Sequence, residues 1–235
     1  MKVKKIAAVF LFLAAVQSCV YANVNYGLDE NKMNALKQSE GLSVNKPEFN
    51  TDAYAKKYKK VTKDGVIMQA MELMNQENIS RYSYKALMGN NLSEKPFKIE
   101  FKNLAEINPE YATFDAFGWE KKNRLYIYVN EKHRNAPPEA IAALLTHEAI
   151  HQDKFASLNE ETYAWTLEAA TWMKLSEKNP SVLKHPSPLV TRENMLQKLF
   201  EKGDYTDKYI KKAVYTNPGY KKLPTRSPGF EDEDL

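Results

Sequence analysis

The residues best suited to chemistry are two histidines that bracket a glutamate, in His147-Glu148-Ala149-Ile150-His151. Residues four positions apart on a helix share one face, with Cβ atoms about 6 Å apart, so both imidazoles can reach one tetrahedral ion such as zinc. Glu148 lies about 100° further round the helix than His147. From there its carboxylate can activate water as a general base. The spacing therefore predicts zinc ligands at His147 and His151, with Glu148 as the catalytic residue.

A catalytic zinc takes three protein ligands and leaves one position open. The best candidates for the third are Glu160 and Glu161, which open the next predicted helix. Ser157 and Glu160 have the spacing of a capping box, in which each side chain binds the other's backbone amide. That contact occupies Glu160 and leaves Glu161 free to face inward, so we predict Glu161 as the ligand. An N-cap at Asn159 instead of Ser157 would weaken this choice.

The other histidines are weaker candidates. His133 lies in a predicted loop and His185 immediately precedes a proline, so we expect both at the surface. A purely structural zinc is an alternative, and it would need a fourth protein ligand such as His185. An oxyanion would require a hydrogen-bond donor, for which Tyr163, His185 and Tyr205 are the candidates.

His147-Glu148-x-x-His151 followed by Glu161-Thr-Tyr-Ala164 resembles the gluzincin group of zinc metallopeptidases. The resemblance covers roughly residues 125–175. It implies a zincin-like fold, zinc bound by His147, His151 and Glu161, and water activated by Glu148.

The chain departs from the gluzincin pattern in two places. Many gluzincins carry an aspartate four residues after the ligand glutamate, where it supports a ligand histidine; this chain has Trp165. The connection between the two helices, residues 152–159, is also short. Asp153 or Glu168 is a candidate for the missing carboxylate, because ligand histidines are usually oriented by such a partner.

The predicted function is an exported zinc-dependent hydrolase, a peptidase acting on a peptide or protein substrate. Zinc would polarise the scissile carbonyl, and Glu148 would carry a proton from water to the leaving amine. The predicted strand 124–129 could hold an extended peptide as an edge strand. The alternative is a non-catalytic, envelope-associated binding protein that keeps a zincin-like fold.

The elements that must position these residues follow from hydrophobic periodicity. Helices are predicted over 53–60, 66–74, 79–88, 140–151, 160–175, 192–202 and 207–214. Strands are predicted over 97–101, 111–119 and 124–129, the last two joined by a polar hairpin turn. This order predicts an α+β domain in which about three strands pack on the metal helix and the glutamate helix, with further helices at both ends.

The N-terminus reads as a secretory leader. Three lysines among the first five residues precede an apolar run over 6–16, which is too short to span a bilayer comfortably. Small residues follow, so cleavage is expected after Ala22. A lipobox-like segment at 16–19 offers the alternative of a lipid anchor on Cys19. Either route places the protein in the periplasm, the cell envelope or outside the cell.

Composition excludes several other classes of protein. The chain has 43% hydrophobic and 27% charged residues, which is typical of a globular protein rather than a disordered one. Loss of the leader removes three of the 34 basic residues and leaves 31 against 30 acidic ones, so no nucleic-acid partner is expected. Cys19 is the only cysteine, so the mature chain must depend on its core or a metal instead of disulfides. The lysine-rich run at 56–60 is expected to be a solvated helix face.

The predicted organisation has four parts. Residues 1–22 form the leader, and 23–60 form a helical and linker segment. Residues 61–223 form the zincin-like domain, with no transmembrane helix expected in the mature chain. Residues 224–235 form a disordered acidic tail.

Overall fold

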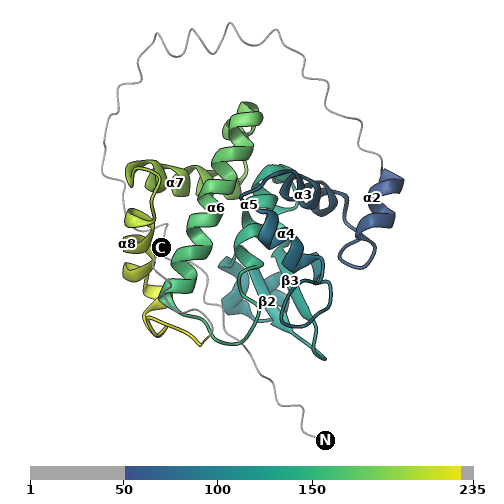
Figure 1. Cartoon of the computed structure of the whole chain (residues 1–235), viewed down its shortest axis with the longest axis horizontal. Coiled ribbons are helices and arrows are strands. Elements are labelled where there is room, and N and C mark those ends of the chain that lie inside the picture. The colour runs from purple at the N-terminus through teal and green to yellow at the C-terminus, as the bar shows by residue number, and fades with distance from the viewer. Residues whose placement is uncertain (1–50, 229–235) are drawn as a thin grey trace, which may run out of the picture.

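A computed structural model describes residues 51–228 of the 235-residue chain (Figure 1). The predicted leader, Cys19 and the segment 23–50 therefore lie outside the described residues, as do residues 229–235 of the predicted tail.

The described residues form an α+β fold. Its α-helices are α2 Thr51–Tyr58, α3 Gly65–Gln76, α4 Arg81–Leu87, α5 Pro138–Glu148, α6 Leu158–Lys178, α7 Pro188–Lys202 and α8 Lys208–Thr216. Its strands are β1 Lys98–Lys102, β2 Ala116–Glu120 and β3 Leu125–Asn130. Five short 3-10 helices connect them: η1 Leu104–Glu106, η2 Pro109–Thr113, η3 Glu131–His133, η4 Pro180–Lys184 and η5 Pro218–Tyr220. The predicted class and the three-stranded sheet are confirmed.

The sheet is mixed, with strand order β1-β3-β2. The predicted hairpin pairs β2 with β3 in antiparallel register, with Gly118 opposite Ile127, and β1 pairs with the other side of β3 in parallel register. The prediction that residues 124–129 form an edge strand is therefore wrong, because β3 has a neighbour on both sides. The two edges are β1 and β2.

The predicted strand 111–119 is strand only from Ala116 onward. Pro109 suits the first turn of a helix, and the Asn108 side chain accepts a hydrogen bond from the Glu110 N–H. These residues start η2 in place of a strand. The turn stacks the Tyr111 ring on the ring of Phe117, 4.7 Å between centroids.

Helix α5 is the central element. Figure 1 shows it between α3 and α6, the two helices with which it makes its main contacts. The Asp64 side chain caps α3 by accepting from Val66 and Ile67 N–H groups, as expected of an N-cap aspartate. The inner faces of α3, the sheet and α5 form the main core, whose members include Met71, Ile127 and Leu144.

A second core cluster joins α6, α7 and α8. It contains Trp165, Leu196 and Ile210, while Trp172 on the same helix belongs to the main core. Both tryptophans are buried and serve packing.

The C-terminal segment is ordered where a disordered tail was predicted. The Leu158 N–H donates to the Pro224 carbonyl at 2.9 Å, and the Asn159 N–H donates to the Thr225 carbonyl at 3.1 Å. The first N–H groups of a helix have no partner within the helix. Residues 224–228 provide such partners, so the prediction of a disordered tail is wrong for this part.

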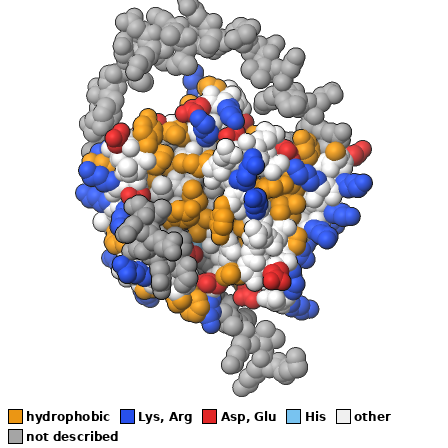
Figure 2. Space-filling view, in the orientation of Figure 1, with side chains coloured by type: hydrophobic (Ala, Val, Ile, Leu, Met, Phe, Trp, Pro, Cys, Tyr) orange, Lys and Arg blue, Asp and Glu red, His pale blue; other side chains and the backbone are white. Residues whose placement is uncertain are grey.

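The lysines of the run 56–60 are exposed, as predicted, but Tyr58 within the run is fully buried and α2 ends at that residue. Lys56, Lys59 and Lys60 are exposed, and Figure 2 shows basic side chains along the side of the molecule where α2 lies. None of the helices between residues 51 and 228 is long and apolar enough to cross a membrane.

Candidate metal centre

The two histidines are brought together by the end of α5. This helix was predicted over 140–151, but it begins at Pro138 and ends at Glu148 instead of continuing to His151. The Ile150 N–H binds the His147 carbonyl at 2.9 Å, a tighter turn of the kind common at helix ends. This turn carries His151 back toward His147, and their Nε2 atoms lie 3.2 Å apart.

Glu161 completes a group of three buried side chains. One ligand atom each from His147, His151 and Glu161 lies within 4.8 Å of the others. The Glu161 carboxylate is 3.8 Å from His147 Nε2 and 3.6 Å from His151 Nε2. The structure therefore brings together the three side chains that the sequence analysis selected.

Glu160 has a different position. Its backbone N–H donates to the Ser157 hydroxyl at 3.2 Å, which confirms one half of the predicted capping box. The prediction that capping occupies the Glu160 carboxylate is wrong, because this group contacts His151 and Ser227. The carboxylate lies 2.8 Å from His151 Nδ1 and accepts from the Ser227 hydroxyl at 3.1 Å. Glu160 therefore orients the His151 ring so that Nε2 faces the common point, a role typical of carboxylates beside ligand histidines.

Glu168 does the same for the other histidine. Its buried carboxylate lies 3.0 Å from His147 Nδ1. Burial opposes ionisation of Glu168, but Arg192 and His147 outweigh it and lower its pKa to about 2. Of the two residues predicted for this support, Glu168 occupies the position. Asp153 instead accepts from the Phe155 N–H within its own loop, at 2.6 Å.

Tyr220 is a site residue that the sequence analysis missed. Its buried hydroxyl accepts a hydrogen bond from Trp165 Nε1 at 3.2 Å and shares a hydrogen bond with Glu161. Burial and the Glu161 carboxylate raise the pKa of Tyr220 well above its ordinary value. Trp165 thus supports the glutamate through a tyrosine.

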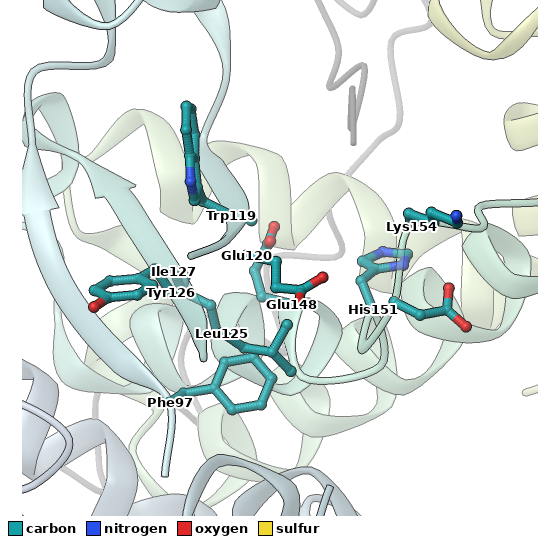
Figure 3. A pocket seen from close by; sticks show the side chains of 11 residues that line it. Phe97, Trp119, Glu120, Leu125, Tyr126, Ile127, Glu148, His151 and Lys154 are labelled. Carbon is teal, nitrogen blue, oxygen red and sulfur yellow. The ribbon is translucent and has the colours of Figure 1, made fainter. Parts of the chain in front are cut away.

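Glu148 faces a cavity. Figure 3 shows its side chain between His151 and the sheet, with Phe97 and Leu125 nearby. Burial raises the pKa of Glu148 to about 7, against the opposing effect of the two histidines. A base with a pKa near the working pH is the most effective proton carrier.

The cavity lies between the strand ends and the loop after His151. The rest of its lining comes from Gly118, Trp119, Glu120, Tyr126, Ile127, Asp153 and Lys154. Three of these residues belong to β2, so the edge strand borders the space that Glu148 faces.

His133 is buried, which makes the prediction of a surface position wrong. Its Nε2 lies 2.6 Å from Asp115 Oδ1, and this pairing lets the ring be buried at low cost. His185 lies outside the three-residue group. The three oxyanion candidates, Tyr163, His185 and Tyr205, are not among the residues that line the cavity of Glu148.

The group of three fits a divalent cation. Two imidazole nitrogens and one carboxylate suit Zn²⁺, and imidazole also suits copper, iron and nickel. Burial lowers the pKa of His151, but Glu161 and Glu160 outweigh it and raise the pKa to about 9. The surroundings therefore stabilise positive charge at this point.

No protein-family model matches the chain, and it matches neither a curated protein nor a solved structure. The arrangement of side chains around His147, His151 and Glu161 is therefore the basis for inferring function.

Proposed function

We propose that the protein is an exported zinc-dependent metallohydrolase with a zincin-like fold, and that it acts as a peptidase of the gluzincin type. One observation carries the proposal. His147, His151 and Glu161 converge within 4.8 Å, and Glu148 faces the adjoining cavity with a buried carboxyl.

The chemistry follows from this arrangement. When bound, zinc would supply a Lewis acid that polarises a carbonyl group and acidifies water. Glu148 would accept a proton on the cavity side and return it to the leaving amine. Glu160 and Glu168 would hold the two imidazoles in orientation through their Nδ1 atoms.

The sheet supports a peptide as the substrate. β2 is an edge strand, and an extended chain can add to such an edge through main-chain hydrogen bonds. Residues Gly118, Trp119 and Glu120 of this strand border the cavity that Glu148 faces. A peptide bound to β2 would therefore run past the catalytic base.

A purely structural zinc is less well supported. Among residues 51–228, the cluster that could hold a metal has three members, whereas a structural site uses four protein ligands. A non-catalytic binding protein is the second candidate function. Glu148 favours the peptidase over it, because a protein that only binds a ligand does not require a general base at the cavity.

The test is zinc content and peptide hydrolysis of the purified protein, with a Glu148→Gln variant. We expect one zinc per chain in both proteins and a ~10²- to 10⁴-fold loss of hydrolysis in the variant. Glu177→Gln is the matched control, because Glu177 lies exposed near the end of α6 and pairs with Lys174; it should change neither property.

Two results would contradict the proposal. Absence of bound zinc after reconstitution would remove the metal centre altogether. One zinc per chain without hydrolysis across a broad peptide mixture would favour the binding protein.

A further inference from the structure

Arg192, on α7, is a nearly buried cation, with 11% of its side chain exposed. Its guanidinium donates to both oxygens of Glu168, with Nη2 2.8 Å from Oε2. Glu168 in turn lies against His147 Nδ1. A two-pronged contact between guanidinium and carboxylate fixes direction as well as distance. Arg192 therefore sets the orientation in which Glu168 meets the histidine.

The Arg192 guanidinium also lies close to Asp115, at the start of the edge strand β2. Arg192 Nε lies 3.4 Å from Asp115 Oδ2, which is an ion pair without a hydrogen bond, and Asp115 immediately precedes β2. Asp115 is itself fixed, because its Oδ1 lies 2.6 Å from His133 Nε2 and its carbonyl accepts from the Asn130 N–H at 2.8 Å. Arg192 thus joins the support of a metal ligand to the strand that borders the cavity.

Three carboxyl groups surround the buried charge of Arg192. Burial opposes its charged form, but Glu168, Glu193 and Asp115 outweigh burial and raise the pKa of Arg192 well above its ordinary value. The Arg192 guanidinium also lies 5.8 Å from the centroid of the Trp165 ring, where the ring face attracts a cation. Apolar packing of equal volume often stabilises a fold as well as buried ion pairs do. Such a network therefore points to a role in positioning.

We propose that Arg192 is a positioning residue that couples the metal centre to the substrate-binding edge of the sheet. Two hydrogen bonds from its guanidinium hold Glu168 against His147, and the charge of the same group attracts Asp115 at the start of β2. The role of this coupling in catalysis rests on the proposed function. The coupling itself predicts that weakening the Asp115 contact changes zinc affinity, and that weakening the Glu168 contact changes the stability of β2.

Two conservative variants test the coupling while leaving Arg192 in place. Asp115→Asn alters a side chain whose contacts are with Lys132, His133 and Arg192, and it should weaken zinc binding by about 2- to 30-fold. Glu168→Gln alters the other end and should speed hydrogen exchange of the β2 amides by a similar factor. Arg192→Lys should produce both effects. Zinc affinity is measured by competition with a chelator, and exchange by mass spectrometry.

Arg134→Lys is the matched control. Arg134 also bridges two carboxylates, those of Asp64 and Glu131, but at the surface with 47% of its side chain exposed. It should leave zinc affinity and β2 exchange unchanged.

The coupling is refuted if Asp115→Asn keeps wild-type zinc affinity and Glu168→Gln keeps wild-type β2 exchange, because the two contacts would then be independent. This result is distinct from failure of the proposed function, in which the wild-type protein itself binds no zinc or hydrolyses no peptide. The effect of Glu168→Gln on β2 can be measured in either case, since it needs no metal.

Discussion

Helix α5 is enclosed by two helices of opposite character (Figure 1). The buried side chains of α3 are all apolar: Ile67, Met68, Ala70, Met71 and Met74. α6 buries apolar residues such as Trp172, and with them the carboxyl side chains of Glu160, Glu161 and Glu168. Burying apolar area stabilises a fold by roughly 25 cal/mol per Å², whereas a buried carboxylate is costly unless it is paired. The comparison teaches that the α3 side of α5 contributes apolar packing alone, whereas the α6 side also holds the carboxylates of the candidate metal centre.

If this division is correct, substitutions in α3 and in α6 should act on different quantities. Changes in α3 should lower the free energy of unfolding and leave metal binding by the folded protein intact. Changes in the α6 carboxylates should act first on metal binding.

The largest effect is expected from Glu161→Ala, which removes a proposed ligand. Zinc content should fall from about one per chain to near zero, because a site with two histidines alone lacks the third donor that such a site uses. Zinc is measured by atomic absorption after dialysis. Glu177→Ala is the control and should retain zinc. Loss of zinc in Glu160→Ala, with full retention in Glu161→Ala, would show that the ligand has been assigned to the wrong glutamate.

Met71→Ala tests the apolar side. Met71 is fully buried, and truncation of such a side chain costs about 2–5 kcal/mol of unfolding free energy. Urea denaturation gives this value, and the zinc affinity of the folded variant should equal that of the wild type. Met195→Ala, at an exposed position, should cost less than about 0.5 kcal/mol. A large loss of zinc affinity in Met71→Ala would break the division between the two sides.

Zinc itself should stabilise the fold through its three proposed ligands, His147, His151 and Glu161. A ligand that binds only the folded state adds about 2.7 kcal/mol at 100 times its dissociation constant. The same increment is expected in wild type and Met71→Ala, with almost none in Glu161→Ala. Thermal unfolding with and without zinc measures it. An equal increment in all three proteins would indicate binding elsewhere on the chain.

The smallest effect concerns pH. Burial opposes ionisation of Asp115, but His133, Arg192 and Lys132 outweigh it and hold its pKa well below the ordinary value. A carboxyl of this kind stabilises the fold fully above its unfolded pKa, about 4, and loses that contribution as the pH falls further. Asp115→Asn should therefore cost about 1–3 kcal/mol at pH 7 and less at pH 3. Urea denaturation at both values measures the change, while the cost of Met71→Ala should stay constant.

The sequence could predict the features that depend on near neighbours along the chain. Helical spacing selected His147 and His151. The capping pattern favoured Glu161 over Glu160, but the Glu160 carboxylate is occupied by His151 and Ser227 instead of by the cap. The hairpin of β2 and β3 was also local. The end of α5 at Glu148 could not be predicted, because Ala149 and Ile150 are compatible with a longer helix.

The remaining features depend on contacts between distant segments. Only the pairing of β1 shows that β3 is central and leaves β2 as an edge. Arg192 reaches Glu168 and Asp115 because α7 packs on α6. Nothing in the sequence around Arg192 indicates either partner. Residues 224–228 resembled a disordered tail because their partners lie at the start of α6.

The three proposed ligands lie within one short stretch, residues 147–161, formed by the end of α5, a turn and the start of α6. Closing a short loop costs little chain entropy, whereas pairing β1 with β3 or Pro224 with Leu158 joins remote segments and is slower. During folding, the ligands can therefore meet before the sheet is complete. If the ligands meet this early, zinc added before refolding would increase the refolding rate. Zinc that bound only the native state would instead decrease the unfolding rate.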